Sequence, residues 1–370
     1  LASGLCLLII REFNGATVDF LGPAPEVRTL CVAYTGIRML SAPFFLLQYA
    51  FSNFFRGLGD TRTPMKVMIA ANVVNIVLDY FLIFGNGPFP ALGVEGAAWA
   101  TFAANAVSAA VFVGIVFSRP YRSGHGTTRH WRPDAGCIGR LLKIGIPIGV
   151  HYVLDMGSFL VFSAYVGRMG TEQLAANQIV IQVLALSFMP CHGIAVAATT
   201  LMGQYIGAGR FDHAKKSSYA TLRLGLLYAG FIGLVYFLFP ESLVRVFNDD
   251  PMVLFFGKRL ILIAAVFQFF DATQMISAGA LRGAGDTKTP MILALGGGWL
   301  IFLPLGYLVG TILDKGVVGA WVGAAVYVAF LGVAMFARLK TERWGRIKLI
   351  DTTEAAGEDA PDSVLGTDLD

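Results

Sequence analysis

Charged residues are scarce in this chain of 370 residues: 14% are Asp, Glu, Lys or Arg, whereas 56% are hydrophobic. Soluble proteins carry about 25% charged residues. The mean hydropathy of +0.66 points in the same direction. These values exclude a soluble enzyme, a disordered chain and a nucleic-acid-binding domain, and they indicate a chain that lies in lipid.

Cysteine is also rare, and the motifs of soluble enzymes are absent. The four cysteines are scattered, with no C-x-x-C pair, so they predict neither a disulfide framework nor a zinc site. The sequence has no P-loop, G-x-G-x-x-G, G-x-S-x-G or H-E-x-x-H motif, which argues against ATP-driven transport by this chain alone. We expect no cofactor, no nucleic-acid partner and no obligate protein partner.

Long apolar runs are abundant. A span needs about 20 mostly apolar residues to cross about 30 Å of hydrocarbon, and unpaired backbone groups cannot face lipid. The sequence therefore predicts an all-α integral membrane protein with nine full transmembrane helices and an apolar fragment at residues 1–10. The predicted spans are 29–54, 65–85, 96–117, 141–166, 175–202, 218–239, 255–280, 291–312 and 318–337.

Lys and Arg are distributed unevenly among the predicted loops. The loops on one side, together with the C-terminal flank, hold 20 of the 28 basic residues, and this side is predicted to be cytoplasmic. Residues 351–370 hold seven acidic residues and no Lys or Arg. We therefore expect a cytoplasmic C-terminus whose acidic tail is disordered after residue 350.

An internal repeat divides the chain. Arg56–Met65 (R-G-L-G-D-T-R-T-P-M) returns at Arg282–Met291 (R-G-A-G-D-T-K-T-P-M), and Gly93–Ala97 is echoed at Gly316–Ala320. Both ten-residue copies fall on the predicted cytoplasmic side, so the repeat is parallel and predicts two lobes that move about a central site. Each copy also suits a turn between helices, because Gly ends one helix and Thr-Pro begins the next.

Acidic residues inside the predicted spans are the strongest functional candidates, because a charge at the bilayer centre costs about 2.5–3.5 kcal/mol. Asp155 and Asp271 lie in mid-span with no Lys or Arg near them, and Asp79 shares a helix face with Asn75. Reversible binding of H⁺ or Na⁺ is one hypothesis, and pairing or helix capping is the other. The first is favoured for Asp155 and Asp271, whereas for Asp79 the two are balanced.

Several apolar features within the spans allow both a structural and a functional interpretation. Pro147, eight residues before Asp155, is a candidate hinge or a static kink. Tyr152 and Phe159 are candidates for facing a cavity that takes flat or cationic substrates. G-x-x-x-G pairs favour close helix packing, and they occur at Gly145/Gly149, Gly306/Gly310 and Gly319/Gly323.

Several motifs together resemble the multidrug and toxic compound extrusion (MATE) family, and within it the bacterial NorM-type branch. They are the paired R-G-x-G-D-T-[RK]-T-P loops, Leu174–Ile179 (L-A-A-N-Q-I), Gly203–Gly209 (G-Q-Y-I-G-A-G) and Phe267–Gln274 (F-Q-F-F-D-A-T-Q). The resemblance implies two six-helix lobes. It places an incomplete N-lobe at 1–117 (end of helix 3 to helix 6), a cytoplasmic connector at 118–140, a C-lobe at 141–340 (helices 7–12) and a tail at 341–370.

Because the chain starts at Leu1, the resemblance also implies that two helices and most of a third precede it, and that this chain alone does not transport. Asp155 and Asp271 resemble the acids of the family's C-lobe cation site on its seventh and tenth helices. Asn75, Asp79 and Thr101 resemble members of a cation site in the N-lobe. The candidates for the substrate cavity are Gln178, Tyr152, Phe159, Gln268 and Gln274.

The predicted function is secondary active export of organic, often cationic, compounds from a bacterium in antiport with Na⁺ or H⁺. The partners would be small-molecule drugs or toxins and the lipid of the inner membrane. One alternative is a flippase for lipid-linked oligosaccharides, which would need a cavity rich in Arg and Lys. A second alternative is a membrane-embedded enzyme, for which His151 and Asp155, four residues apart, are the nearest candidate pair.

Overall fold

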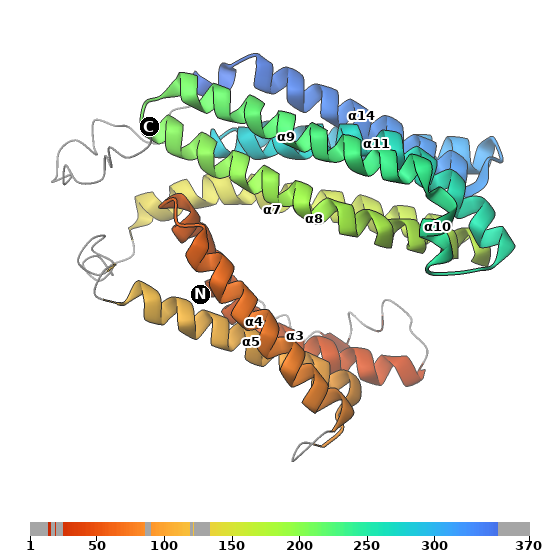
Figure 1. Ribbon diagram of the computed structural model, residues 1–370, viewed down its shortest axis with the longest axis horizontal. Helices are drawn as coiled ribbons and strands as arrows, with labels where there is room; N and C mark the ends of the chain where they lie inside the picture. Colours follow the sequence, from red (N-terminus) through yellow and green to blue (C-terminus); the bar gives the residue numbers. More distant parts are fainter. Residues whose placement is uncertain are drawn as a thin grey trace. The chain divides into compact units, whose positions relative to one another are not determined.

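The computed structural model describes residues 14–15, 19, 25–85, 90–118, 121 and 134–346. The predicted fragment at 1–10, most of the predicted connector and the acidic tail lie outside these residues. The chain forms two compact units, which meet in the sequence between Pro133 and Asp134. Each is described by itself, first as the N unit and then as the C unit (Figure 1).

Nine helices within the described residues are long and apolar enough to cross a membrane, and the same residues contain no β-strand. The prediction of an all-α membrane protein is therefore confirmed, and each predicted span coincides with one of these helices, with ends that differ by at most seven residues. Large apolar side chains such as Leu227 and Leu300 are exposed, as expected for surfaces that face lipid tails.

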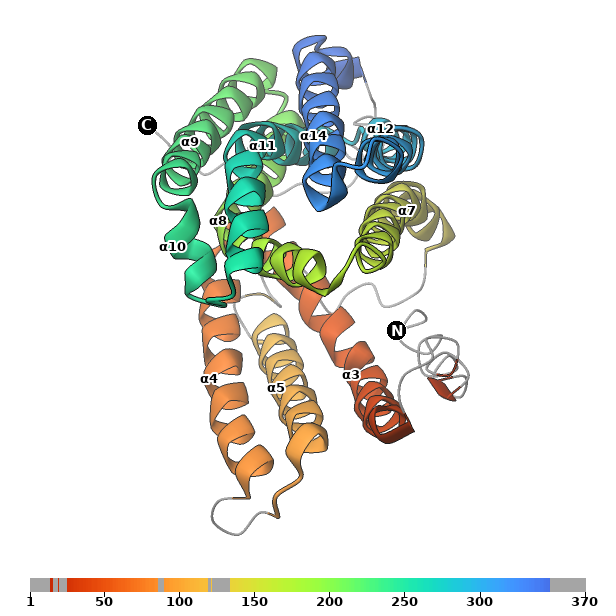
Figure 2. The same cartoon turned by 90° about the vertical axis from the view of Figure 1, so that its right-hand side faces the viewer.

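The N unit contains three long helices, and α5 packs against both of the others. Figure 2 shows the three side by side. The helices are α3 (Pro25–Gly57), α4 (Arg62–Phe84) and α5 (Gly93–Val116). A small buried cluster joins them, made of Phe55, Val67, Phe112 and Val116.

The C unit has a larger core, built around one central helix. Helix α11 (Pro251–Gly283) packs against α8 (Thr171–Gly207), α9 (Phe211–Leu238) and α14 (Gly316–Lys340) (Figures 1 and 2). Helix α7 (Ala135–Val166) packs mainly against α12 (Lys288–Gly297). Helices α11 and α14 are the most deeply buried of these spans.

The eighth predicted span is not a regular α-helix. After α12, wider π turns at η1 (Gly298–Phe302) and η2 (Leu308–Ile312) flank the short helix α13 (Leu303–Tyr307). Pro304 lies within α13 and lacks the N–H group that a regular helix would use. The sequence analysis also did not predict two short helices, α10 (Pro240–Arg245) and η3 (Arg343–Arg346).

Close helix packing is found at two of the three predicted glycine pairs. A methyl group on Gly323 would lie 2.7 Å from the backbone nitrogen of Gly306. These two segments can therefore approach this closely only because glycine has no side chain. By contrast, Gly145 and Gly149 have no atom within 4 Å of an added methyl group among the described residues. Within the C unit no described neighbour packs closely on that pair.

The two copies of the ten-residue repeat form the same backbone turn, which confirms its structural interpretation. Gly59 has a φ of 85° and Gly285 a φ of 84°, a left-handed conformation that glycine adopts without a steric penalty. The amide of Asp60 donates to the carbonyl of Phe55 at 2.9 Å, and the amide of Asp286 donates to that of Leu281 at 2.9 Å.

The side-chain partners of the two aspartates differ. Asp60 accepts from the amide of Thr63 at 3.0 Å and from the hydroxyl of Tyr121 at 3.3 Å. Hydrogen bonds from Thr63 hold the pKa of Asp60 below its usual range. Asp286, only 5% exposed, likewise accepts from the amide of Thr289 at 3.2 Å, but its Oδ2 accepts from both Nε and Nη2 of Arg338 at 2.7 Å.

Candidate functional site

Three helices of the C unit bring two acids and a tyrosine together. Asp155 lies on α7, Asp271 on α11 and Tyr327 on α14. The hydroxyl of Tyr327 lies 3.4 Å from Oδ1 of Asp155, and the carboxyl groups of Asp155 and Asp271 interact electrostatically. The phenol of Tyr327 also interacts electrostatically with the carboxyl group of Asp271. The two acids predicted for the C-lobe therefore belong to one cluster, which we call the acid cluster.

A buried polar network lies one helical turn from Asp271. Gln268 is 1% exposed, and its Oε1 accepts from the hydroxyl of Ser187 at 3.5 Å. Tyr236 in turn donates to Oγ of Ser187 at 2.8 Å. The Nε2 group of Gln268 has no hydrogen-bond partner among the described residues. This donor, on the same helix as Asp271, is available to a further acceptor.

Aromatic rings extend the acid cluster toward the irregular span. Phe302, from η1, stacks on Tyr327 with ring centroids 5.3 Å apart, and Phe159 lies 5.7 Å from Phe302. Phe159 is half-buried. The predicted cavity residue Phe159 is thus connected to Asp155 through two other aromatic side chains.

Tyr152 is exposed and lies beside the repeat turn rather than at the acid cluster. The guanidinium carbon of Arg282 lies 5.9 Å from the centre of its ring, and Nη1 is 3.5 Å from its hydroxyl. His151 stacks on the same ring at 5.8 Å. His151 is buried, and its Nδ1 has no partner among the described residues, so it makes no hydrogen bond to Asp155 through that atom.

The remaining predicted residues of the C unit are spread over different surfaces. Gln178 is exposed and Gln274 is half-buried. Pro147 is buried, and helix α7 continues through it from Ala135 to Val166. The structure therefore places Gln268 near the acid cluster but does not bring the three glutamines together through any hydrogen bond among the described residues.

The candidate residues of the N unit form no comparable cluster. Asn75 and Asp79 lie one turn apart on α4, and both are half-buried. Thr101, on α5, donates to the carbonyl of Ala97 in its own helix at 2.9 Å. Among the described residues no hydrogen bond joins these three side chains, and Nδ2 of Asn75 has no partner.

The sequence did not predict the place of Tyr327 in the acid cluster or the pairing of Asn177 with Trp321. The Nε1 group of Trp321 donates to Oδ1 of the fully buried Asn177 at 2.9 Å. Tyr327 and Trp321 both lie on α14, which carries no acidic residue, whereas Asn177 lies on α8. The available signal was a Tyr and a Trp within one apolar helix, because buried Tyr and Trp usually need a hydrogen-bond partner.

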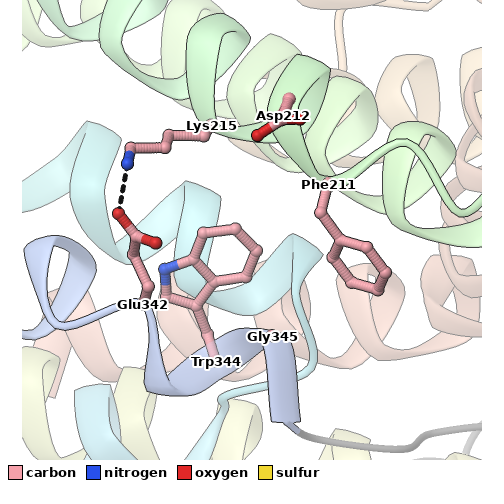
Figure 3. Close-up of a pocket in the computed structure, with 6 residues that line it drawn as sticks. All are labelled: Phe211, Asp212, Lys215, Glu342, Trp344 and Gly345. Carbon is pink, nitrogen blue, oxygen red and sulfur yellow. Dashed lines mark ion pairs between the residues drawn. The ribbon is translucent and has the colours of Figure 1, made fainter.

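A separate hollow of about 220 Å³ lies where η3 meets the start of α9 (Figure 3). Lys215 and Glu342 form an ion pair across it, and Trp344 donates from Nε1 to the carbonyl of Leu339 at 2.9 Å. Phe211 and Asp212 complete the lining with Gly345. These contacts attach the segment after α14 to the C unit, far along α14 from Tyr327.

The chemistry available at the acid cluster is exchange of a small cation. Among the described residues, no group of three or more His, Cys, Asp or Glu is placed to hold a metal ion. Two carboxyl groups and a phenol provide oxygen atoms only, which suit a proton or a hard cation with water completing its shell. Their interaction makes binding at one carboxyl sensitive to the charge on the other.

Comparison with known proteins is consistent across sequence and fold. A profile of the MatE family matches residues 1–81 and 147–308. The probable multidrug resistance protein NorM of Thermotoga maritima is 34% identical, over 92% of this chain and 74% of its own length. The multidrug resistance protein PmpM of Pseudomonas aeruginosa is 32% identical, over 97% of this chain and 78% of its length.

A solved structure shares the fold at low sequence identity. It is the outward-facing conformation of a multidrug resistance MATE family transporter of the MOP superfamily, and it is 18% identical. The TM-score is 0.85, over 97% of this chain and 77% of the solved chain.

Proposed function

The chain belongs to the MatE family, and on this premise we propose that it is a secondary active multidrug exporter driven by H⁺ or Na⁺. The family's members are transporters, so the hypothesis of a membrane-embedded enzyme is rejected. The names of the relatives, multidrug resistance proteins NorM and PmpM, support small drugs or toxins as substrates.

The convergence of Asp155, Asp271 and Tyr327 from three helices is the observation that carries the coupling proposal. Two carboxylates that interact within apolar surroundings repel each other, and a cation bound between them is correspondingly stabilised. Loss of that cation changes the charge shared by side chains of α7, α11 and α14. A cation that binds one conformation better than another shifts the equilibrium between them.

Substrate would meet the aromatic and amide side chains near this cluster. We assign Phe159, Gln268 and Gln274, with the exposed Tyr152 and Gln178, to a substrate path in which aromatic faces attract organic cations. Pro147, two turns from Asp155, is the proposed hinge of α7. A bend there would move the Asp155 side chain relative to α11 when the bound cation leaves.

The acidic and aromatic character of the cluster disfavours the alternative of a flippase for lipid-linked oligosaccharides, whose pyrophosphate would need Arg and Lys. We further propose that the protein lies in the bacterial inner membrane with the repeat turns and the C-terminus on the cytoplasmic side. A cysteine introduced in η3 should then react with an impermeant maleimide in everted vesicles and remain unreactive in intact cells.

The coupling proposal is tested by ethidium efflux under an imposed H⁺ or Na⁺ gradient, with the full-length protein expressed from its gene. We expect Asp155→Asn and Asp271→Asn each to slow gradient-driven efflux by at least about tenfold, because each removes one charged group that binds the cation. Running the two gradients separately identifies the ion. Asp249→Asn, whose side chain is 84% exposed, is the matched control and should transport normally.

The N unit offers a second arm of the same experiment. If Asn75, Asp79 and Thr101 held the coupling cation instead, Asp79→Asn would stop efflux while the two C-unit variants kept it. Normal efflux by both Asp155→Asn and Asp271→Asn, at normal protein levels, would show that the coupling site lies elsewhere.

A further inference from the structure

A cavity of about 720 Å³ opens at the end of the C unit where α7 ends and α14 begins. Its volume lies in the range of about 300–1,000 Å³ typical of ligand pockets. Val161 and Phe162 line it from α7, and Leu303 lines it from α13. Residues of the two neighbouring turns, Arg168 and Asp314, carry the charges of the lining.

The cavity is built rather than incidental, because several lining groups hold one another in place. Tyr165 donates to the carbonyl of Gly306 at 2.8 Å and accepts from Thr311 at 3.2 Å. Gln173 accepts from the amide of Val317 at 2.7 Å, which fixes the first turn of α14. One wall is the π turn η2, and π turns frequently occur at functional sites.

Two opposite charges in this cavity are left without partners inside the C unit. Arg168 and Asp314 are both exposed, and neither forms a side-chain hydrogen bond or an ion pair with any described residue. The ring of Tyr307 lies 5.8 Å from that of Tyr165. The hydroxyl of Tyr307 forms no hydrogen bond with any described residue. A ligand that carries a positive and a negative group close together would satisfy the two charges at once.

The position of the cavity restricts which ligand can reach it. Helix α7 ends at Val166 and α8 begins at Thr171, while η2 ends at Ile312 and α14 begins at Gly316. The charged residues therefore lie in the turns between spans, and the apolar lining lies within the last turns of the spans. In a membrane this places the charges at the level of lipid head groups, with Tyr165 and Tyr307 in the interfacial belt.

We propose that this cavity binds a zwitterionic phospholipid with a primary ammonium group, phosphatidylethanolamine. The phosphate lies against the guanidinium of Arg168, which suits phosphate geometry. The ammonium donates to the carboxylate of Asp314 and the hydroxyl of Tyr307. The first segments of the acyl chains pack against Val161 and Leu303.

The charges of the cavity distinguish this lipid from others. Phosphatidylglycerol has a phosphate for Arg168 but presents only hydroxyl groups to Asp314, so the carboxylate gains no opposite charge. An organic cation would pair with Asp314 and leave Arg168 without an anion. Since both charges line the same cavity, the zwitterion is the ligand that neutralises them together.

The test is lipid titration of the delipidated protein, followed by native mass spectrometry. Wild-type protein should bind dioleoylphosphatidylethanolamine about tenfold more tightly than dioleoylphosphatidylglycerol, as expected for one additional charged hydrogen bond. Arg168→Gln should weaken both lipids, whereas Asp314→Asn should remove the preference between them. Lys315→Gln changes an exposed charge next to Asp314 that does not line the cavity, and it should behave as wild type.

Equal binding of the two lipids by the wild-type protein would overturn the head-group assignment. The proposed position of the lipid would be wrong if Arg168→Gln and Asp314→Asn both bound lipid as tightly as the wild type. It would also be wrong if Lys315→Gln weakened lipid binding as much as those two variants. Because all three residues are exposed, the variants are expected to fold, and their melting temperatures verify this. Lipid binding does not require transport. The result of this titration is therefore independent of the coupling proposal, which the ethidium efflux experiment tests.

Discussion

The two copies of the ten-residue repeat have the same backbone but different anchors. In the N unit the half-buried Asp60 accepts a hydrogen bond from Tyr121, whereas in the C unit the buried Asp286 is held by Arg338 at the end of α14. The turn itself therefore needs only its glycine and the aspartate that caps the next helix. What differs is whether the second carboxylate oxygen meets a neutral hydroxyl or a full positive charge.

The same contrast extends to the polar residues within the spans. In the C unit, α11 packs against three helices, and Asp271 on it interacts electrostatically with Asp155 and Tyr327. In the N unit, α5 has two neighbours, and Thr101 bonds only within its own helix. More complete enclosure of a helix leaves its polar groups dependent on other helices for partners. The comparison predicts that substitutions at equivalent positions have larger effects in the C unit.

The largest effect on stability is expected from Arg338→Ala. It leaves the buried carboxylate of Asp286 without its cation, and removal of one partner from a buried pair costs about 3 kcal/mol. Thermal unfolding in detergent should show a large drop in melting temperature. Adding Asp286→Asn to this variant should recover part of the loss, because the uncompensated charge is gone. A melting temperature unchanged by Arg338→Ala would contradict the described anchor.

A smaller effect is expected from Asp60→Ala, and it should depend on pH. Capping by an aspartate contributes about 1 kcal/mol. Because hydrogen bonds from Thr63 lower the pKa of Asp60 in the folded protein, its contribution is complete above the unfolded pKa of about 3.9. That contribution disappears as the pH falls through the lower folded value. The difference in melting temperature between wild type and Asp60→Ala should therefore shrink on acidification.

Asp60→Asn provides the control for this pH dependence, because Asn also caps helices but does not titrate. It should retain most of the wild-type stability at neutral pH. A difference between wild type and Asp60→Ala that grew toward acidic pH would have the wrong sign for a lowered pKa.

The smallest effect is expected from Tyr121→Phe, which removes a single hydroxyl at 3.3 Å from Asp60. One neutral hydrogen bond contributes about 0.5–1.5 kcal/mol, and the carboxylate of Asp60 keeps its contacts with Thr63. The change in melting temperature should be several times smaller than that of Arg338→Ala. Equal losses from the two variants would remove the proposed difference between the anchors.

Most of the fold could be predicted because the bilayer imposes strict rules on length and polarity. Each of the nine full spans predicted from the sequence is a helix in the described part of the chain, since lipid leaves the backbone no other partner. The π turns on either side of Pro304 could not be predicted in the same way. Hydropathy indicates which residues avoid water. A π turn differs from an α turn only in which backbone carbonyl accepts each amide hydrogen bond, and this difference does not alter the hydropathy of the segment.

The candidate site was predicted only in part, for a related reason. Asp155 and Asp271 are conspicuous because an acid in an apolar helix is costly, but Tyr327 lies 172 residues from Asp155. Nothing local in the sequence indicates which helix faces which. For Gly145 and Gly149 the spacing predicts close packing, and the described residues of the C unit offer no neighbour that approaches them.

The anchor of Asp286 also has a consequence for the order of events during synthesis. Arg338 follows Asp286 by 52 residues, so at about 5–20 residues per second the acid leaves the ribosome about 3–10 s before its partner. Throughout that interval the nascent C unit carries a carboxylate that its final structure buries. Helix α14 thus completes a turn between two helices that are made before it, and a chain released before Arg338 would expose an uncompensated acid to the cell's quality control.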